Sequence, residues 1–116
     1  MNDDGAIQAF AALAQKTRFD VFRLLVKHEP EGMPAGEIAR QLGVAHNTLS
    51  AHLAGLTRAG LTHAERHSRS ITYRADLALI QRLAAFLVED CCGVQEACEP
   101  VMPGHTRFQS KMAADV

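Results

Sequence analysis

LGVAHNTLSAHL, residues 42–53, carries the clearest structural signal in the chain. Leu49 and Leu53 in this stretch, and Leu56 just beyond it, have the spacing of residues on one face of a helix. We expect a helix over residues 46–59, closed by Gly60, and a preceding helix that ends at Gly43. Two short helices joined by a few residues that include glycine are the pattern of a helix-turn-helix.

Helical patterns occupy most of the remaining chain. Apolar residues recur at spacings of three and four on both sides of the central pair. The expected helices run over residues 5–15, from Thr17 onward, from Pro34 to Gly43, and from Asp76 onward. Thr17 with Asp20 resembles a capping box, and Asp76 is a good N-cap for the last helix.

A β-hairpin is expected between the last two helices. In residues 61–75 the helical period stops: Ile71, Tyr73 and Ala75 alternate with Thr72 and Arg74, which is typical of a strand, and His67-Ser68 is the expected turn. A helix-turn-helix followed by such a hairpin, or wing, predicts a mainly α winged helix-turn-helix with the element order ααααββα.

Length and composition fit one globular domain. The chain has 116 residues, of which 47% are hydrophobic. We expect a domain over residues 1–99 and a mobile tail over residues 100–116. The chain has no apolar run long enough to span a membrane, and its acidic start is unlike a secretory signal, so we expect a cytoplasmic protein with no membrane partner.

Charge is segregated along the chain although the total is only −1. Residues 38–75 contain a single acid, Glu65, against five arginines: Arg40, Arg58, Arg66, Arg69 and Arg74. Acids outnumber bases in the segments before and after. Because phosphates respond to the nearby face and not to the total charge, this segment favours a partner such as double-stranded DNA.

The polar side of the helix over residues 46–59 carries the candidate DNA contacts. Short polar groups near the N-terminus of a recognition helix let it lie deep in a major groove, where Asn can pair with adenine and Ser or Thr with bases or phosphates. The candidate DNA-binding residues are His46, Asn47, Thr48, Ser50, Ala51, His52, Arg58, Arg66 and Arg69. His52 also fits a second interpretation, a packed histidine that supports the helix.

These motifs resemble the ArsR/SmtB family of metal-responsive repressors over residues 5–92. The resemblance is carried by the segments TLSAHL (48–53), RAGL (58–61) and RSITYR (69–74). It implies a homodimeric transcriptional repressor that binds operator DNA. Two positions depart from the family. Ala45 stands where a capping serine is frequent, which predicts a slightly frayed recognition helix, and Ser68 stands where the wing often has glycine, which predicts a reshaped tip.

Three cysteines gather near the C-terminus: Cys91, Cys92 and Cys98. Their odd number argues against a disulfide framework. Soft thiolates select soft ions, and three sulfurs suit a pyramidal As(III) or Sb(III) centre, whereas Zn²⁺ requires a fourth ligand. The resemblance points the same way, because this cluster is similar to a C-terminal cysteine site of arsenite-responsive members. Residues 37–42 lack the cysteines, and residues 76–90 the histidines, of the other family sites. The inducer expected from this resemblance is As(III), with Sb(III) as an alternative.

The first and last helices are more apolar than a small domain needs for its own core. We therefore expect a homodimer through these two helices, with Leu83 and Leu87 on the apolar face of the last helix in the interface. A dimer also satisfies geometry, since two recognition helices must address major grooves about 34 Å apart.

Other interpretations of these motifs remain open. The cysteines also fit small apolar residues that cap a core, a thiol redox or persulfide sensor, or a site for another soft metal. The fold also fits a winged-helix module that binds protein and not DNA. The sequence has no candidate catalytic triad, phosphate loop or paired catalytic carboxylates, so we do not expect an enzyme.

Overall fold

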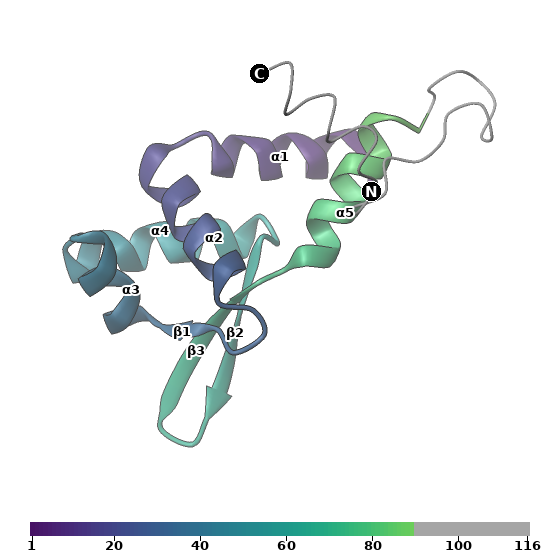
Figure 1. Ribbon diagram of the computed structural model, residues 1–116. Coiled ribbons are helices and arrows are strands. Elements are labelled where there is room, and N and C mark those ends of the chain that lie inside the picture. Colours follow the sequence, from purple (N-terminus) through teal and green to yellow (C-terminus); the bar gives the residue numbers. More distant parts are fainter. Residues whose placement is uncertain (90–116) are drawn as a thin grey trace, which may run out of the picture. The chain divides into compact units, whose positions relative to one another are not determined.

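The computed structural model describes residues 1–89 of the chain. Cys91, Cys92 and Cys98 and the tail over residues 100–116 lie outside the described residues. In chain order the elements are α1 (Asp3–Leu13), α2 (Lys16–Lys27), β1 (Met33–Pro34), α3 (Ala35–Leu42), α4 (His46–Arg58), β2 (Thr62–His67), β3 (Ser70–Ala75) and α5 (Leu77–Leu87). Met1–Phe86 form one compact unit (Figure 1).

The predicted helix-turn-helix is confirmed as α3 and α4. Gly43 ends α3 in the left-handed conformation, with φ of 67°, and α4 begins three residues later at His46. The predicted inner face of α4 is fully buried: Leu49, Leu53 and Leu56. Together with the hairpin that follows, these helices make the fold a winged helix-turn-helix.

Two helix caps test the predictions made from short polar residues. The prediction for Asp76 is confirmed, because its Oδ1 accepts the Leu79 N–H at 3.0 Å at the start of α5. The capping box at Thr17 is wrong. The chain enters α2 one residue earlier, and the Gln15 side chain accepts the Arg18 N–H at 2.9 Å. A long glutamine is a weak N-cap in general, so the local pattern did not favour it.

The sheet contains one strand that the alternating pattern did not predict. Its order is β1-β3-β2, with both pairs antiparallel, and β1 pairs Met33 with Tyr73 and Pro34 with Thr72. A two-residue strand has no periodicity to detect, and proline usually argues against a strand. Here Pro34 is on an edge strand, where its missing N–H costs no bond within the sheet.

The wing is a tight hairpin, displaced by one residue from the expected turn. His67 pairs with Ser70, so the connecting residues are Ser68 and Arg69 and not His67-Ser68. Ser68 has a φ of 60°, the conformation that a glycine adopts without strain. The Ser70 hydroxyl donates to the His67 carbonyl at 3.1 Å and closes the turn from the other side.

The core draws on every helix, and α5 joins it through Leu79 and Leu83. The largest fully buried side chains are Val21, Leu25, Ile38, Leu49, Leu53, Leu56 and Leu61. Leu83 is only 3% exposed, so the expectation that it belongs to a dimer interface is wrong: its side chain packs into its own protomer. Some apolar residues of α5 pack into the core and others face outward. The spacing of apolar residues in the sequence does not show which residues do which.

Several large apolar side chains remain exposed on α1 and at the ends of α5. Ile7 and Leu87 are each 63% exposed, and Phe10 and Leu77 also face outward. None of the helices within residues 1–89 has both the length and the apolar character needed to cross a bilayer.

Candidate nucleic-acid interface

One face of α4 presents most of the predicted contacts to solvent. His46, Asn47, Thr48, Ser50 and Ala51 are all exposed. They alternate with the buried leucines because successive helical residues point about 100° apart. The anchored side therefore holds the helix in place and leaves the polar side free for a ligand.

The N-terminus of α4 has an unusual cap. Ala45 occupies the N-cap position and has no side chain that can accept a hydrogen bond. The Thr48 N–H, which a serine at this position would ordinarily bind, donates instead to Asn47 Oδ1 at 2.8 Å. The first turn is thus capped from within the helix, by the side chain predicted to pair with adenine. Asn47 has to release Thr48 before its amide can make both bonds to a base.

His52 lies at the edge of this face and not within it. It is half-buried, and its Nδ1 is 3.5 Å from the NH1 atom of Arg18 in α2. A guanidinium can only donate, so Nδ1 is the acceptor in this contact. The contact fits the supporting role that the sequence left open for His52.

Sequence reasoning did not identify Arg18 as part of this region. It is 34 positions away from His52, and nothing in the α2 pattern indicates that it faces α4. Its Nε also donates to the Ala12 carbonyl at 2.6 Å, which ties the end of α1 to the start of α2.

The five arginines of the basic segment have different roles. Arg40 pairs with Glu37 one turn earlier on α3. Arg74 pairs with the carboxylates of Glu29 and Glu65. Arg40 and Arg74 are therefore both paired with acids and are not free to bind a phosphate. Among residues 1–89, the structure gives no ion pair to the three arginines predicted to hold phosphates: Arg58, Arg66 and Arg69. The count of five therefore overstated the charge available for a ligand.

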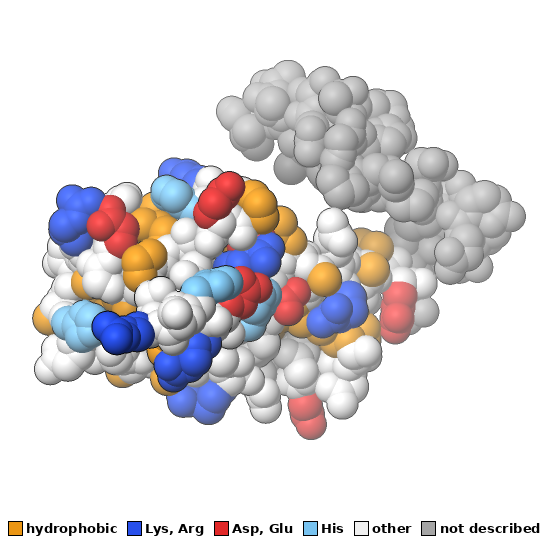
Figure 2. All heavy atoms as spheres, turned by 90° about the horizontal axis from the view of Figure 1, so that it is seen from below, with side chains coloured by type: hydrophobic (Ala, Val, Ile, Leu, Met, Phe, Trp, Pro, Cys, Tyr) orange, Lys and Arg blue, Asp and Glu red, His pale blue; other side chains and the backbone are white. Residues whose placement is uncertain are grey.

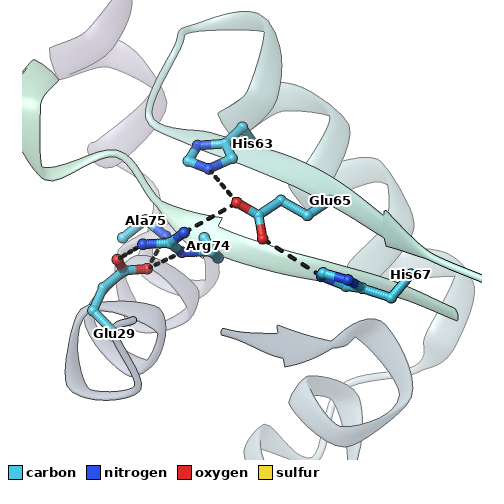
Figure 3. Close-up of polar contacts among 6 residues, drawn as sticks. All are labelled: Glu29, His63, Glu65, His67, Arg74 and Ala75. Carbon is cyan, nitrogen blue, oxygen red and sulfur yellow. Dashed lines mark hydrogen bonds and ion pairs between the residues drawn. The ribbon is translucent and has the colours of Figure 1, made fainter. Parts of the chain in front are cut away.

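Arg74 anchors the wing to the loop after α2 (Figure 3). Its guanidinium donates to Glu29 through NH2 at 2.7 Å and through Nε at 3.2 Å, and to Glu65 through NH1 at 3.0 Å. Glu29 also accepts the Ala75 backbone N–H at 3.2 Å. The hydrogen bonds that Arg74 donates to Glu29 and, next in effect, to Glu65 raise the pKa of Arg74, and the bond to Glu65 is the main cause that lowers the pKa of Glu65.

Two histidines flank Glu65 on the outer face of β2. The Nε2 atoms of His63 and His67 lie 3.4 Å and 3.5 Å from its carboxylate oxygens (Figure 3). His63, Glu65 and His67 are alternate residues of one strand, so their side chains share a face while their Cα atoms are two residues apart along the strand. No group of three or more His, Cys, Asp or Glu within residues 1–89 is arranged to hold a metal ion.

The surface seen from below combines charges of both signs (Figure 2). Lys and Arg side chains are spread across this face, and His and acidic side chains lie between them. On this face the basic side chains therefore do not form one continuous patch.

Comparisons with known proteins agree with this geometry. Residues 13–63 match the family described as helix-turn-helix domain, a span that includes α2, α3 and α4. No curated protein matches the sequence.

Solved structures with a similar fold include an ArsR-like transcriptional regulator from Rhodococcus sp. RHA1, which is 24% identical with a TM-score of 0.65, over 96% of this chain and 89% of that one. A second is a homodimeric winged helix-turn-helix DNA-binding domain from Mycobacterium bovis, a possible ArsR-family regulator, 26% identical with a TM-score of 0.59, over 78% and 94%. A third is the transcriptional repressor BigR from Xylella fastidiosa, 25% identical with a TM-score of 0.56, over 74% and 86%.

Proposed function

We propose that this chain is a DNA-binding transcriptional repressor that acts as a homodimer. The observation that carries the proposal is the exposed N-terminal half of α4, where short polar side chains stand on a helix anchored by three buried leucines. Arg58 at the end of the helix and Arg66 and Arg69 in the wing would hold phosphates on either side of the groove. The similarity to winged-helix regulators supports the same conclusion.

The homodimer would form through the exposed apolar side chains of α1 and α5. Ile7, Phe10 and Leu87 are large, apolar and exposed in the single chain, which favours burial against a second copy. Two recognition helices related by a two-fold axis would address successive major grooves of a palindromic site.

The inducer in this proposal is As(III), with Sb(III) as the alternative. The ligands would be Cys91, Cys92 and Cys98, and the support comes from the sequence alone: three thiols, no histidine between them, and a preference of thiolates for soft ions. Coordination deprotonates the thiols, so the acidic residues near them do not prevent binding.

Binding of the ion would lower the affinity for DNA through the last helix. Cys91 follows the end of α5 by four residues, so an ion held there would restrain the helix that carries the exposed Leu87. A coupling free energy of about 1–3 kcal/mol would be enough to change DNA affinity by about 5–150-fold.

A titration of the purified protein on duplex DNA from upstream of its own gene tests the proposal. We expect specific, salt-sensitive binding that arsenite reverses under reducing conditions. A protein-interaction module would show no salt-dependent affinity for duplexes. Release by peroxide or persulfide, but not by arsenite, would support a redox sensor of the same fold and contradict the As(III) proposal.

The cysteines can be tested one at a time. Each single Cys→Ser variant at 91, 92 and 98 should bind DNA like wild type, since none lies in α3, α4 or the wing. Each should remain bound when arsenite is added, because a hydroxyl is a poor ligand for As(III). A disulfide mechanism uses two sulfurs and would leave one cysteine dispensable. Normal release by the Cys98→Ser protein would rule out the three-thiolate site.

A further inference from the structure

An open hollow of about 210 Å³ lies where the end of α1 and the first turn of α2 meet α4. Its lining consists of two arginines and three small residues with no acidic group: Ala11, Ala12, Arg18, Gly55 and Arg58. The arginines come from elements far apart in the sequence, so the tertiary structure alone brings two cations to one concave site.

Two hydrogen bonds hold Arg18 in this hollow. Its Nε donates to the Ala12 carbonyl at 2.6 Å and its NH1 to His52 Nδ1 at 3.5 Å. Within residues 1–89 the structure gives it no carboxylate partner. The guanidinium is therefore oriented and keeps its full positive charge, with further N–H donors not used by these two bonds.

Arg58 contributes the second guanidinium from the end of the DNA-facing stripe of α4. The stripe consists of exposed residues at spacings of four, three and four: Asn47, Ala51, Ala54 and Arg58. At a rise of 1.5 Å per residue the ends of this stripe are about 16 Å apart. The major groove is about 12 Å wide. When Asn47 lies over base edges, Arg58 is at the rim, where the phosphates are.

Gly55 keeps the space between the two cations open. A Cβ at this position would stand 3.7 Å from Arg18 Cδ and 3.9 Å from Arg58 NH2, so a longer side chain there would occupy the hollow. Two arginines that line one open site without a carboxylate suit the planar, multidentate recognition of a phosphate group.

We propose that the Arg18–Arg58 hollow binds one phosphate of the DNA backbone at the rim of the major groove. This inference rests on the proposed DNA-binding function and adds Arg18 to it as a contact from α2. Because Arg18 also bonds Ala12 and His52, the same phosphate would be linked to the end of α1 and to the imidazole at the edge of the reading face.

The salt dependence of DNA binding tests the hollow directly. The slope of log K against log salt falls by about 0.9 for each phosphate that the protein no longer neutralises. We expect the slope of the Arg18→Gln/Arg58→Gln double variant to fall by about 0.9 in total, because both cations serve one phosphate. Arg23→Gln, an exposed arginine of α2 outside the hollow, should keep the wild-type slope. A fall of about 1.8 in the double variant would mean two separate phosphates, and an unchanged slope would mean none; either result overturns the proposal.

A second pair of variants avoids the structural bonds of Arg18. Ala11→Glu introduces a carboxylate at the exposed edge of the hollow, and Ala11→Gln is its matched control for size. We expect Ala11→Glu to weaken DNA binding by at least tenfold relative to Ala11→Gln at low salt, with the same thermal midpoint. Equal affinity of the two variants would overturn the site.

Inorganic phosphate distinguishes the DNA backbone from a free anion as the ligand. Arginine side-chain NMR signals of the DNA-free protein would be followed during a phosphate titration. We expect only weak, millimolar binding. Tight binding of inorganic phosphate, together with an unchanged salt slope in the double variant, would overturn the assignment to DNA. If the wild-type protein binds no duplex at all, the proposed function fails, which is a separate result.

Discussion

Gly32 lies where the loop after α2 passes across β3. Its φ is 76°, and a Cβ built on it would be 2.6 Å from both Thr72 Cγ2 and the Tyr73 carbonyl oxygen. Both the backbone conformation and the space therefore require glycine. This close approach is what brings the Glu29 carboxylate within reach of Arg74.

Replacing Gly32 by alanine, which adds one methyl group, tests this close approach of the loop to β3. Gly32→Ala should lower the free energy of unfolding by about 2–4 kcal/mol, because it combines left-handed strain with a clash against backbone. Gly36→Ala in α3 is the control, since a Cβ there meets nothing within 4 Å and alanine favours a helix. Thermal unfolding of the two variants checks the prediction. A Gly32→Ala midpoint equal to that of Gly36→Ala would contradict it.

Asn47 has two uses that compete for one amide group. In the free chain its Oδ1 accepts the Thr48 N–H, and in a DNA complex the same oxygen would be needed at the base edge. The cause is Ala45, which leaves the N-cap position without an acceptor.

Ala45→Ser should separate the two uses. A serine hydroxyl at the N-cap would accept the Thr48 N–H and stabilise the fold by about 1 kcal/mol. Asn47 would then be free in the unbound chain, so we expect tighter DNA binding as well as a higher thermal midpoint. Ala45→Val, which offers no acceptor, is the control. A gain in stability without a gain in affinity would show that the Asn47 bond does not oppose DNA binding.

The wing is held in place by ionic contacts that span distant elements. Glu29 lies in the loop after α2, Glu65 on β2 and Arg74 between them on β3 (Figure 3). A two-stranded hairpin is only marginally stable alone, and this wing depends on β1 and on these contacts at its base. Its tip, with Arg69, extends beyond them.

Acid should weaken this anchor. The hydrogen bond from Arg74 lowers the pKa of Glu65 below its ordinary value of 4.5 in the folded chain. A depressed folded-state pKa stabilises the fold above the unfolded-state value, and this contribution disappears as the pH falls through the folded-state pKa. The stabilisation of wild type over Glu65→Gln, measured as the difference in thermal midpoint, should therefore be present above pH 4.5 and decrease as the pH falls below it. Glu31→Gln, an exposed acid of the loop after α2, should show no such change; an equal pH dependence in both variants would contradict the assignment.

The chain as a whole divides its apolar residues between a core and an outer face. On α5 the division runs between Leu83, which is 3% exposed, and Leu87, which is 63% exposed. Only the second can be buried by another copy without unfolding the protomer. The same holds for Ile7 and Phe10 on α1.

Aspartate substitutions should distinguish the core from the proposed dimer interface. Leu87→Asp should give a folded monomer, because the charge stays in water unless a partner covers it. Leu83→Asp should unfold the protomer, since the charge would be buried without a counter-ion. Sedimentation velocity and circular dichroism measure the two outcomes. A Leu87→Asp protein that remains dimeric would move the interface away from this end of α5.

The local patterns of this chain were readable without coordinates. The spacing of Leu49, Leu53 and Leu56 identified α4, Gly43 marked the end of α3, Asp76 capped α5, and alternation identified the wing. Each of these depends on neighbours within a few positions, where the period of a helix or a strand and the chemistry of a cap leave a direct trace.

The contacts that give those elements their roles depended on chain packing. Glu29 and Arg74 are 45 positions apart, Arg18 and His52 are 34 apart, and β1 is a strand only because β3 lies beside it. No local period encodes such pairs, so a basic segment counted as five arginines resolves into anchors and free cations only when the chain is folded. The division of α5 between core and outer face has the same origin, since apolar spacing shows that a face is buried but not by which surface.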